Sequence, residues 1–224
     1  MNNKQINSKQ EKSSHSKQKN VNKIIQILAK KYPNVRTDLN HYSPFELLIA
    51  TILSAQCTDK RVNIVTPALF AAFSNVYEFA KAKQEEIEQL IFTTGFYKNK
   101  AKNIIACSQM LVEKYNGEVP SQMSELIELP GVGRKTANCV LGNYFEPAGI
   151  VVDTHVIRIT NLLGIVNTKN AEKIEKELMA IIPKKHWVNF THYLIRLGRE
   201  TCIARHPKCS QCEINSYCES YSKK

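Results

Sequence analysis

The chain has 224 residues, of which 43% are hydrophobic, and its 31 Lys and Arg against 20 Asp and Glu give a formal net charge of +11. This length and apolar content allow one large domain or two small ones with an ordinary core, and they exclude a wholly disordered chain. The basic balance predicts a polyanionic partner, because a positive surface attracts phosphates at long range.

The N-terminus gives no sign of export or membrane insertion. No apolar run approaches the roughly 20 residues needed to cross a bilayer, and the first residues lack the apolar core of a secretory signal. We therefore expect a soluble cytoplasmic protein with no membrane partner. Residues 1–20 are almost entirely Lys, Asn, Gln and Ser, so they bury too little to offset the entropy of ordering and predict a disordered basic tail. This tail either adds attraction to the polyanion or is solvated without a role.

Hydrophobic periodicity in the first half of the chain predicts helices. Ser43, Pro44 and Glu46 supply an N-cap, a first-turn proline and a capping-box glutamate for a helix that is apolar nearly all round and belongs in a core. The polar turn after it contains Gln56, and Pro67 should kink or divide the helix that follows. The predicted helices of this half cover 21–32, 44–53, a stretch after residue 59, 84–92 and 98–115.

The second half continues the helical pattern, with start and stop signals at each segment. Only residues 149–152 resemble a strand, and four residues without a partner do not form a sheet. The sequence therefore predicts an all-α fold. The predicted helices of this half cover 121–129, 134–144, 154–163, 169–182 and 185–200.

Four of the seven cysteines crowd the C-terminus, and with an odd total a secreted disulfide framework is a poor interpretation. Cys202, Cys209, Cys212 and Cys218 follow the spacing C-x6-C-x2-C-x5-C in a segment that has little to fold around except a metal centre. Four thiolates suit a [4Fe-4S] cluster or a structural zinc, and because only the middle pair is closely spaced, the spacing favours the cluster. Structural cysteines without metal are a third alternative.

The first two of these cysteines enclose a basic loop, 203–208, that contains Arg205 and Lys208. A metal centre would hold this loop rigid, and its cationic side chains could contact a phosphate backbone. The other cysteines lie in helical or core-like contexts and are interpreted as buried small apolar side chains: Cys57, Cys107 and Cys139.

A glycine-rich turn at 129–133 connects two predicted helices. Gly131 and Gly133 allow positive φ and a close approach of backbone to ligand. Successive N–H groups around Val132, followed by a helix N-terminus, form an anion site that suits a phosphate. A tight helix–helix turn would also explain a lone Gly-x-Gly, but the neighbouring Arg134 and the basic net charge favour the phosphate.

Two side chains beyond this turn are candidates for chemistry. Lys135 falls in the first turn of its helix, where the helix dipole disfavours a cation. It is interpreted either as a phosphate ligand or as an amine that forms a Schiff base with a sugar carbon. Asp153 stands where it can cap the next helix, and capping alone would explain it. An ionised aspartate there could also stabilise cationic character at the sugar or move a proton.

Together these motifs resemble the endonuclease III family, the bifunctional DNA glycosylases of the helix-hairpin-helix superfamily. The resemblance covers about residues 21–220 and leaves the N-terminal tail outside. Its motifs occur in the expected order and are jointly specific. They are LSAQ at 53–56, LPGVGRKTAN at 129–138, VDTH at 152–155 and the four-cysteine ending.

The resemblance implies two all-α lobes. A continuous six-helix barrel with the helix-hairpin-helix motif would cover 37–148. Residues 21–36 together with 149–224 would form the second lobe, with one [4Fe-4S] cluster on the four C-terminal cysteines. DNA would bind in the cleft between the lobes, where Lys135 and Asp153 would meet.

The resemblance also implies base-excision repair of double-stranded DNA that contains damaged pyrimidines or abasic sites, by a nucleoid-associated monomer. Lys135 would attack C1′ of an oxidised pyrimidine nucleotide, expel the base and form a Schiff base that undergoes β-elimination, with Asp153 assisting. Because chemistry at C1′ in a duplex requires the nucleotide to be flipped out, Gln56 would fill the vacated space and Phe96 would act as the wedge. Phe96 departs from the aliphatic residue usual in the family, which leaves the sequence-context preference open.

Two alternatives compete with this interpretation. The adenine-specific mismatch glycosylases share the hairpin and the cluster, but they usually lack the lysine and carry an extra C-terminal domain, whereas this chain ends six residues after Cys218. A non-catalytic DNA-binding protein with a redox-sensing cluster would need a cation but not an aspartate partner. The presence of both Lys135 and Asp153 favours the lysine-dependent enzyme.

Overall fold

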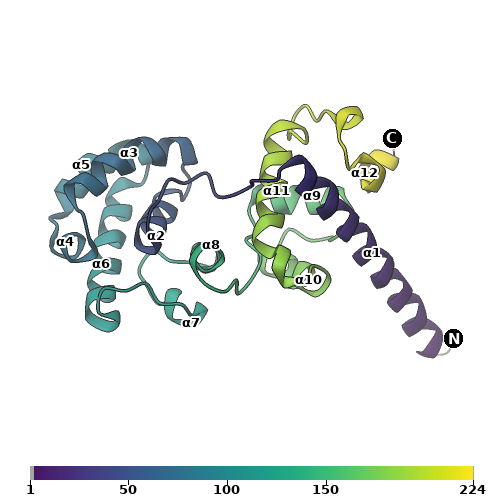
Figure 1. Ribbon diagram of the computed structural model, residues 1–224, viewed down its shortest axis with the longest axis horizontal. Coiled ribbons are helices and arrows are strands. Elements are labelled where there is room, and N and C mark those ends of the chain that lie inside the picture. Colours follow the sequence, from purple (N-terminus) through teal and green to yellow (C-terminus); the bar gives the residue numbers. More distant parts are fainter. Residues whose placement is uncertain (1–2, 224) are drawn as a thin grey trace. The chain divides into compact units, whose positions relative to one another are not determined.

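The computed structural model describes the backbone of residues 3–223 and the side chains of residues 17–223, and every regular element within these ranges is a helix (Figure 1). The all-α prediction is confirmed, and 149–152 forms no strand. The chain divides into two compact units, Thr37–Ala148 and the combination of Met1–Arg36 with Gly149–Lys224. Across the part of the chain that is described, no helix has the length and apolar character needed to cross a membrane.

The unit Thr37–Ala148 is built around one apolar cluster. Helix α2 lies at its centre, because every side chain from Leu47 to Leu53 is buried. Helix α6 packs against α4 and α5, and α2 packs against α8 (Figure 1). The elements of this unit are α2 (Pro44–Leu53), α3 (Asp59–Ala72), α4 (Val76–Lys81), α5 (Gln84–Ile91), the 3-10 turn η1 (Phe92–Thr94), α6 (Tyr97–Tyr115), α7 (Met123–Leu126) and α8 (Arg134–Tyr144).

The structure differs from the expected elements of this unit in three places. Pro67 lies inside α3, which continues through it without division. The short helix α4 was not predicted, although Asn75 caps it through bonds to the N–H groups of Tyr77 and Glu78 at 3.0 and 3.1 Å. Six residues are too few to display a helical period. Helix α7 covers four residues and is shorter than expected.

The second unit has an apolar cluster of its own. Helix α1 contributes Val21 and Leu28 to it, and α11 contributes Phe190 and Leu194, all four fully buried. The elements of this unit are α1 (Asn3–Lys31), α9 (Thr154–Leu162), α10 (Ala171–Ile181), the 3-10 turn η2 (Lys184–His186), α11 (Trp187–Glu200), the 3-10 turns η3 (Cys209–Gln211) and η4 (Asn215–Tyr217), and α12 (Glu219–Ser222).

Helix α1 includes most of the stretch 1–20, for which the sequence predicts a disordered tail. It begins at Asn3 and runs without a break to Lys31. The stretch contains no glycine or proline, and once residues 21–31 are packed as a helix, each added turn needs no new nucleus. Residues 1–2 and the side chains before residue 17 lie outside the described part of the chain.

Candidate active site and metal centre

The turn at 129–133 is anchored by its apolar residues. Leu129 and Val132 point into the core of their unit and are 2% and 7% exposed. The Val132 N–H donates to the Leu129 carbonyl at 3.0 Å, which closes the turn. Gly131 has φ +79°, and a Cβ there would lie 2.9 Å from the Cβ of Asn103. The fold therefore requires glycine at position 131, for its dihedral angle and for its small size.

Gly133 is a glycine for a different reason. It is the N-cap of α8 with an ordinary φ of −96°, and a Cβ built on it would meet nothing within 4 Å. A glycine N-cap has no side chain to accept from the first N–H groups of α8, and helix N-termini of this kind suit an anion. The protein itself does not need glycine at position 133, whereas close approach of a ligand to the backbone would.

Lys135 lies in the first turn of α8 with its side chain exposed. One turn further along, burial raises the pKa of the Cys139 thiol, and the positive charge of Lys135 opposes that shift. The Thr51 hydroxyl of α2 donates to the Cys139 sulfur at 3.8 Å. The helix that carries the candidate amine is thus held against the core helix α2, while the amine itself faces solvent.

Asp153 belongs to the other unit and caps α9, as the sequence predicts. Its Oδ1 accepts from the Val156 N–H at 2.8 Å. The carboxylate is half-buried. Burial lowers the pKa of His155, and the negative charge of Asp153 opposes this lowering. Capping uses one carboxylate oxygen, so the same side chain can hold the helix and present a negative charge.

Gln56 and Phe96 share an unusual backbone conformation. Their φ angles are 51° and 49°, in the left-handed region that residues other than glycine rarely adopt. Both side chains are exposed, Phe96 to 66%. Gln56 follows the end of α2, and Phe96 occupies the N-cap position of α6. Each turn holds its side chain outward on a short, constrained segment.

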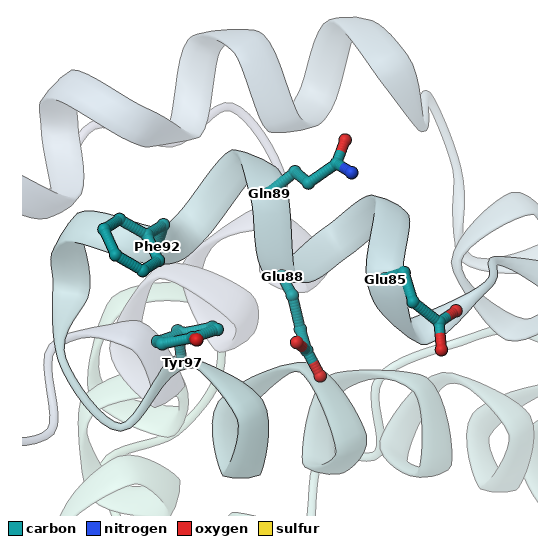
Figure 2. A pocket seen from close by; sticks show the side chains of 5 residues that line it. All are labelled: Glu85, Glu88, Gln89, Phe92 and Tyr97. Carbon is teal, nitrogen blue, oxygen red and sulfur yellow. The ribbon is translucent and has the colours of Figure 1, made fainter.

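A pocket of about 420 Å³ lies beside the Phe96 turn (Figure 2). The rings of Phe92 and Tyr97, with centroids 4.9 Å apart, form one part of it. Glu85 and Glu88 contribute carboxylates to the same lining, which repel a phosphate. This pocket is therefore a poor site for DNA chemistry, and we interpret the ring contact as a brace at the base of the turn that carries Phe96.

The four C-terminal cysteines lie on a folded segment of the second unit. All are free thiols and half-buried, and three of them pack against the core of that unit. The Lys208 N–H donates to the Thr201 carbonyl at 2.9 Å, which closes the basic loop and leaves Arg205 and Lys208 exposed. Burial and the three neighbouring cysteines raise the pKa of the Cys202 thiol.

The donor chemistry of these thiols suits an iron–sulfur centre, because four cysteine thiolates complete the ligand set of a [4Fe-4S] cluster. The electrostatic coupling of Cys202 to the other three shows that the four thiols share one neighbourhood. Metal binding would replace their protons and remove the penalty of grouping them.

Sequence analysis missed Arg158, which connects the helix of Asp153 to the cysteine segment. Its Nη2 donates to the Cys202 carbonyl at 2.8 Å. Gly198 makes room for this contact, because a Cβ there would lie 3.0 Å from Nη2 of Arg158 and closer still to the His155 ring. The helical position of Arg158, five residues after Asp153, is the only sequence signal of its role.

Comparison with known proteins decides the family. The family described as HhH-GPD superfamily base excision DNA repair protein matches residues 49–184, and the iron-sulfur binding domain of endonuclease III matches residues 202–218. Endonuclease III of Synechocystis sp. is 47% identical over 92% of this chain and 94% of that protein. The chain belongs to the endonuclease III family. It is accordingly a DNA glycosylase and AP lyase by class, and its cofactor is a [4Fe-4S] cluster.

Solved structures agree with this assignment. A non-covalent endonuclease III–DNA complex superposes with a TM-score of 0.87 at 43% identity and covers 92% of this chain and 97% of that one. A trapped endonuclease III–DNA covalent intermediate gives the same values. A thermostable thymine-DNA glycosylase, at 21% identity and a TM-score of 0.83, shares the fold.

Proposed function

We propose that this enzyme removes oxidised pyrimidines from double-stranded DNA and cleaves the strand at the resulting abasic site. The observation that carries the proposal is the exposed Lys135 amine in the first turn of α8, directly after Gly133. This amine lies beside the anion site of the glycine turn, and an amine can form a Schiff base with a sugar carbon. A related endonuclease III has been solved as a trapped covalent intermediate with DNA.

In the proposed reaction, Nζ of Lys135 attacks C1′ of the flipped nucleotide, and the base leaves with the bonding electrons and takes up a proton. The nitrogen gives up one proton and the ring oxygen takes one up as the C1′–O4′ bond breaks, which leaves a C1′=N iminium. The iminium acidifies the C2′ hydrogen, whose loss expels the 3′ phosphate, and water then hydrolyses the iminium to the free amine and an unsaturated sugar aldehyde. Asp153 would stabilise the positive charge that develops at the sugar and carry a proton.

Gln56 and Phe96 would open the duplex. Flipping a nucleotide leaves a gap and costs stacking energy of a few kcal/mol, least for a damaged pair. The exposed side chains on their two constrained turns suit insertion, Gln56 as the filler and Phe96 as the wedge. The left-handed backbone at both positions favours a single presentation of each side chain, which lowers the entropy lost on insertion.

The remaining candidate residues would position the phosphate backbone. The first N–H groups of α8 and Arg134 would contact one phosphate at the turn 131–133. Arg205 and Lys208 would contact another from the closed basic loop. The cluster ligands would be Cys202, Cys209, Cys212 and Cys218, and the cluster would supply rigid support for that loop. With chromosomal DNA as its substrate, the enzyme would act as a monomer at the nucleoid.

Gly133→Ser tests whether the glycine serves DNA approach. Serine is a better N-cap than glycine by a few tenths of a kcal/mol, and the structure has room for its Cβ. We expect unchanged or slightly higher thermal stability, and duplex affinity reduced about tenfold because one charge-assisted hydrogen bond, worth about 1.5 kcal/mol, is blocked. Fluorescence anisotropy with an abasic duplex measures the loss. Unchanged affinity would refute the role, and Gly131→Ala should instead destabilise the fold.

Asp153→Asn separates capping from chemistry. Asparagine caps helices as well as aspartate does, so the unfolding free energy should fall by no more than about 1 kcal/mol from the lost charge. Single-turnover strand cleavage should slow on the order of 10²- to 10⁴-fold. The matched control is Asn170→Ala, which removes the cap of α10 in the same unit and should cost about 1 kcal/mol of stability without slowing cleavage. Equal rates for Asp153→Asn and the parent would leave Asp153 with capping alone.

A panel of duplexes tests the substrate class. Each duplex carries one lesion, either an oxidised pyrimidine, an oxidised purine or an unmodified mismatch, and base release is followed under single-turnover conditions. We expect release from the oxidised pyrimidines and strand cleavage at a preformed abasic site. Release confined to purines would contradict the proposed substrate.

A further inference from the structure

Lys100 is a buried cation in the unit Thr37–Ala148. It lies in the first turns of α6 and is 5% exposed. Its Nζ donates to two backbone carbonyls, those of Leu53 and Thr94, each at 2.8 Å. Within the described residues, no carboxylate lies within ion-pair distance of this ammonium. A buried charge whose hydrogen-bond partners are carbonyl dipoles is costly, and a neighbouring cysteine, Cys57, offsets only part of the effect of burial on its pKa.

The two carbonyls lie at the bases of the two turns that present Gln56 and Phe96. Leu53 is the last residue of α2, three positions before Gln56. Thr94 ends η1, two positions before Phe96. The Lys100 backbone N–H also donates to the Phe96 carbonyl at 3.0 Å. Lys100 therefore holds both sides of the Gly95–Phe96 turn and the end of α2 at the same time.

The first of these two contacts caps the end of α2. The last carbonyls of α2 are mostly satisfied locally, since the backbone N–H and hydroxyl of Ser54 donate to Ala50 and Thr51 and the Ala55 N–H donates to Ile52. Leu53 alone receives its donor from a residue 47 positions away. A cation beside this C-terminus is favoured by the helix dipole, although burial lowers the pKa of Lys100.

We propose that Lys100 is a positioning residue that couples the Gln56 turn to the Phe96 turn, so that both side chains enter the duplex in a fixed relation. The ammonium can donate to both carbonyls at once, which no apolar core residue could do. This inference rests on the proposed insertion of Gln56 and Phe96. Lys100 would act through them and would not contact the reacting atoms.

Lys100→Met tests this coupling, because methionine matches the length of lysine and lacks the donors. Two substrates are compared. One is a duplex with a paired oxidised pyrimidine, which must be opened. The other is a single strand with an abasic site, which needs no opening. We expect base release from the duplex to slow on the order of 10- to 100-fold, while borohydride trapping on the single strand stays within about twofold of the parent. A fluorescent base opposite the lesion should report reduced unstacking.

Leu111→Ala is the matched control. Leu111 is fully buried in the same helix α6, and its apolar side chain cannot form a hydrogen bond to either turn. It should lower thermal stability and affect both substrates equally. Equal losses on both substrates for Lys100→Met, or no loss on either, would overturn the proposal and leave Lys100 a structural residue.

A double-variant cycle identifies the route of the effect. In a Gln56→Ala, Phe96→Ala background, Lys100→Met should slow duplex opening by no more than about twofold further, since the residues it positions are gone. A full additional loss would show that Lys100 acts elsewhere. Failure of the proposed chemistry would be visible separately, because the parent protein would then form no adduct on the abasic strand.

Discussion

Lys135→Ala should abolish the covalent adduct that borohydride traps between the enzyme and DNA with an abasic site. The amine is the only proposed source of the Schiff base, so strand cleavage should fall by at least the order of 10³-fold. The fold should not suffer, because the exposed side chain leaves the first turn of α8, where a cation is disfavoured by about 0.3–1 kcal/mol. We therefore expect an inactive variant with equal or higher thermal stability and measurable duplex affinity.

Lys173→Ala provides the matched control for this result. Lys173 is also an exposed lysine in a first helical turn, that of α10, and its loss should change stability similarly while trapping continues at the parent rate. An adduct that persists in Lys135→Ala would move the nucleophile to another amine. Loss of the adduct in both variants would point to a general effect of positive charge on DNA binding.

Cys212→Ser should remove the cluster and loosen the C-terminal segment. Cys212 is half-buried against the core of its unit, and its backbone joins the two 3-10 turns through bonds to Cys209 and Asn215 at 3.2 and 3.1 Å. With three ligands left, we expect the brown colour to disappear and iron to fall from about four atoms per chain towards zero. Trypsin should then cut rapidly at the exposed Arg205 and Lys208, because the loop between the first two ligands is no longer held.

A cysteine outside the cluster separates this effect from general thiol loss. Cys57→Ser changes a half-exposed cysteine of the other unit, and it should keep the colour and the resistance of the basic loop to trypsin. A colourless, active Cys212→Ser protein that contains zinc would contradict the cluster assignment. The Lys31–Glu213 ion pair, at 2.6 Å, would still tie the segment to α1, so the segment should loosen without detaching at once.

The elements and motifs that sequence reasoning predicted correctly have local causes. Helix α8 covers the predicted residues 134–144, because the glycine before it and the apolar spacing within it are both visible along the chain. The Glu46 N–H donates to the Ser43 hydroxyl oxygen as expected. Glu46, however, accepts from the Tyr42 N–H, one residue before the cap. The spacing of Ser43 and Glu46 does not specify which of the two neighbouring N–H groups the glutamate binds.

Other features depended on contacts that spacing does not encode. Helix α1 extends back to Asn3 from residues 21–31, which pack against the core of their unit. The composition of residues 1–20 does not reveal that packed helix. Lys100 reads as one more lysine of an amphipathic helix until its two carbonyl partners are seen. Arg158 likewise has its partner 44 positions away at Cys202.

The sequence by itself determined that the chain is helical, that four cysteines crowd the C-terminus with a metal-ligand spacing, and that a lysine follows a glycine turn. These properties rest on side-chain chemistry and on interactions within a few residues. Only the tertiary structure decided that Gly131 is required by Asn103 while Gly133 faces open space, and that one buried ammonium joins two distant turns. The physical reason is that steric exclusion, burial and hydrogen-bond partners depend on which distant segments pack together. A pattern of neighbouring residues does not show which segments these are.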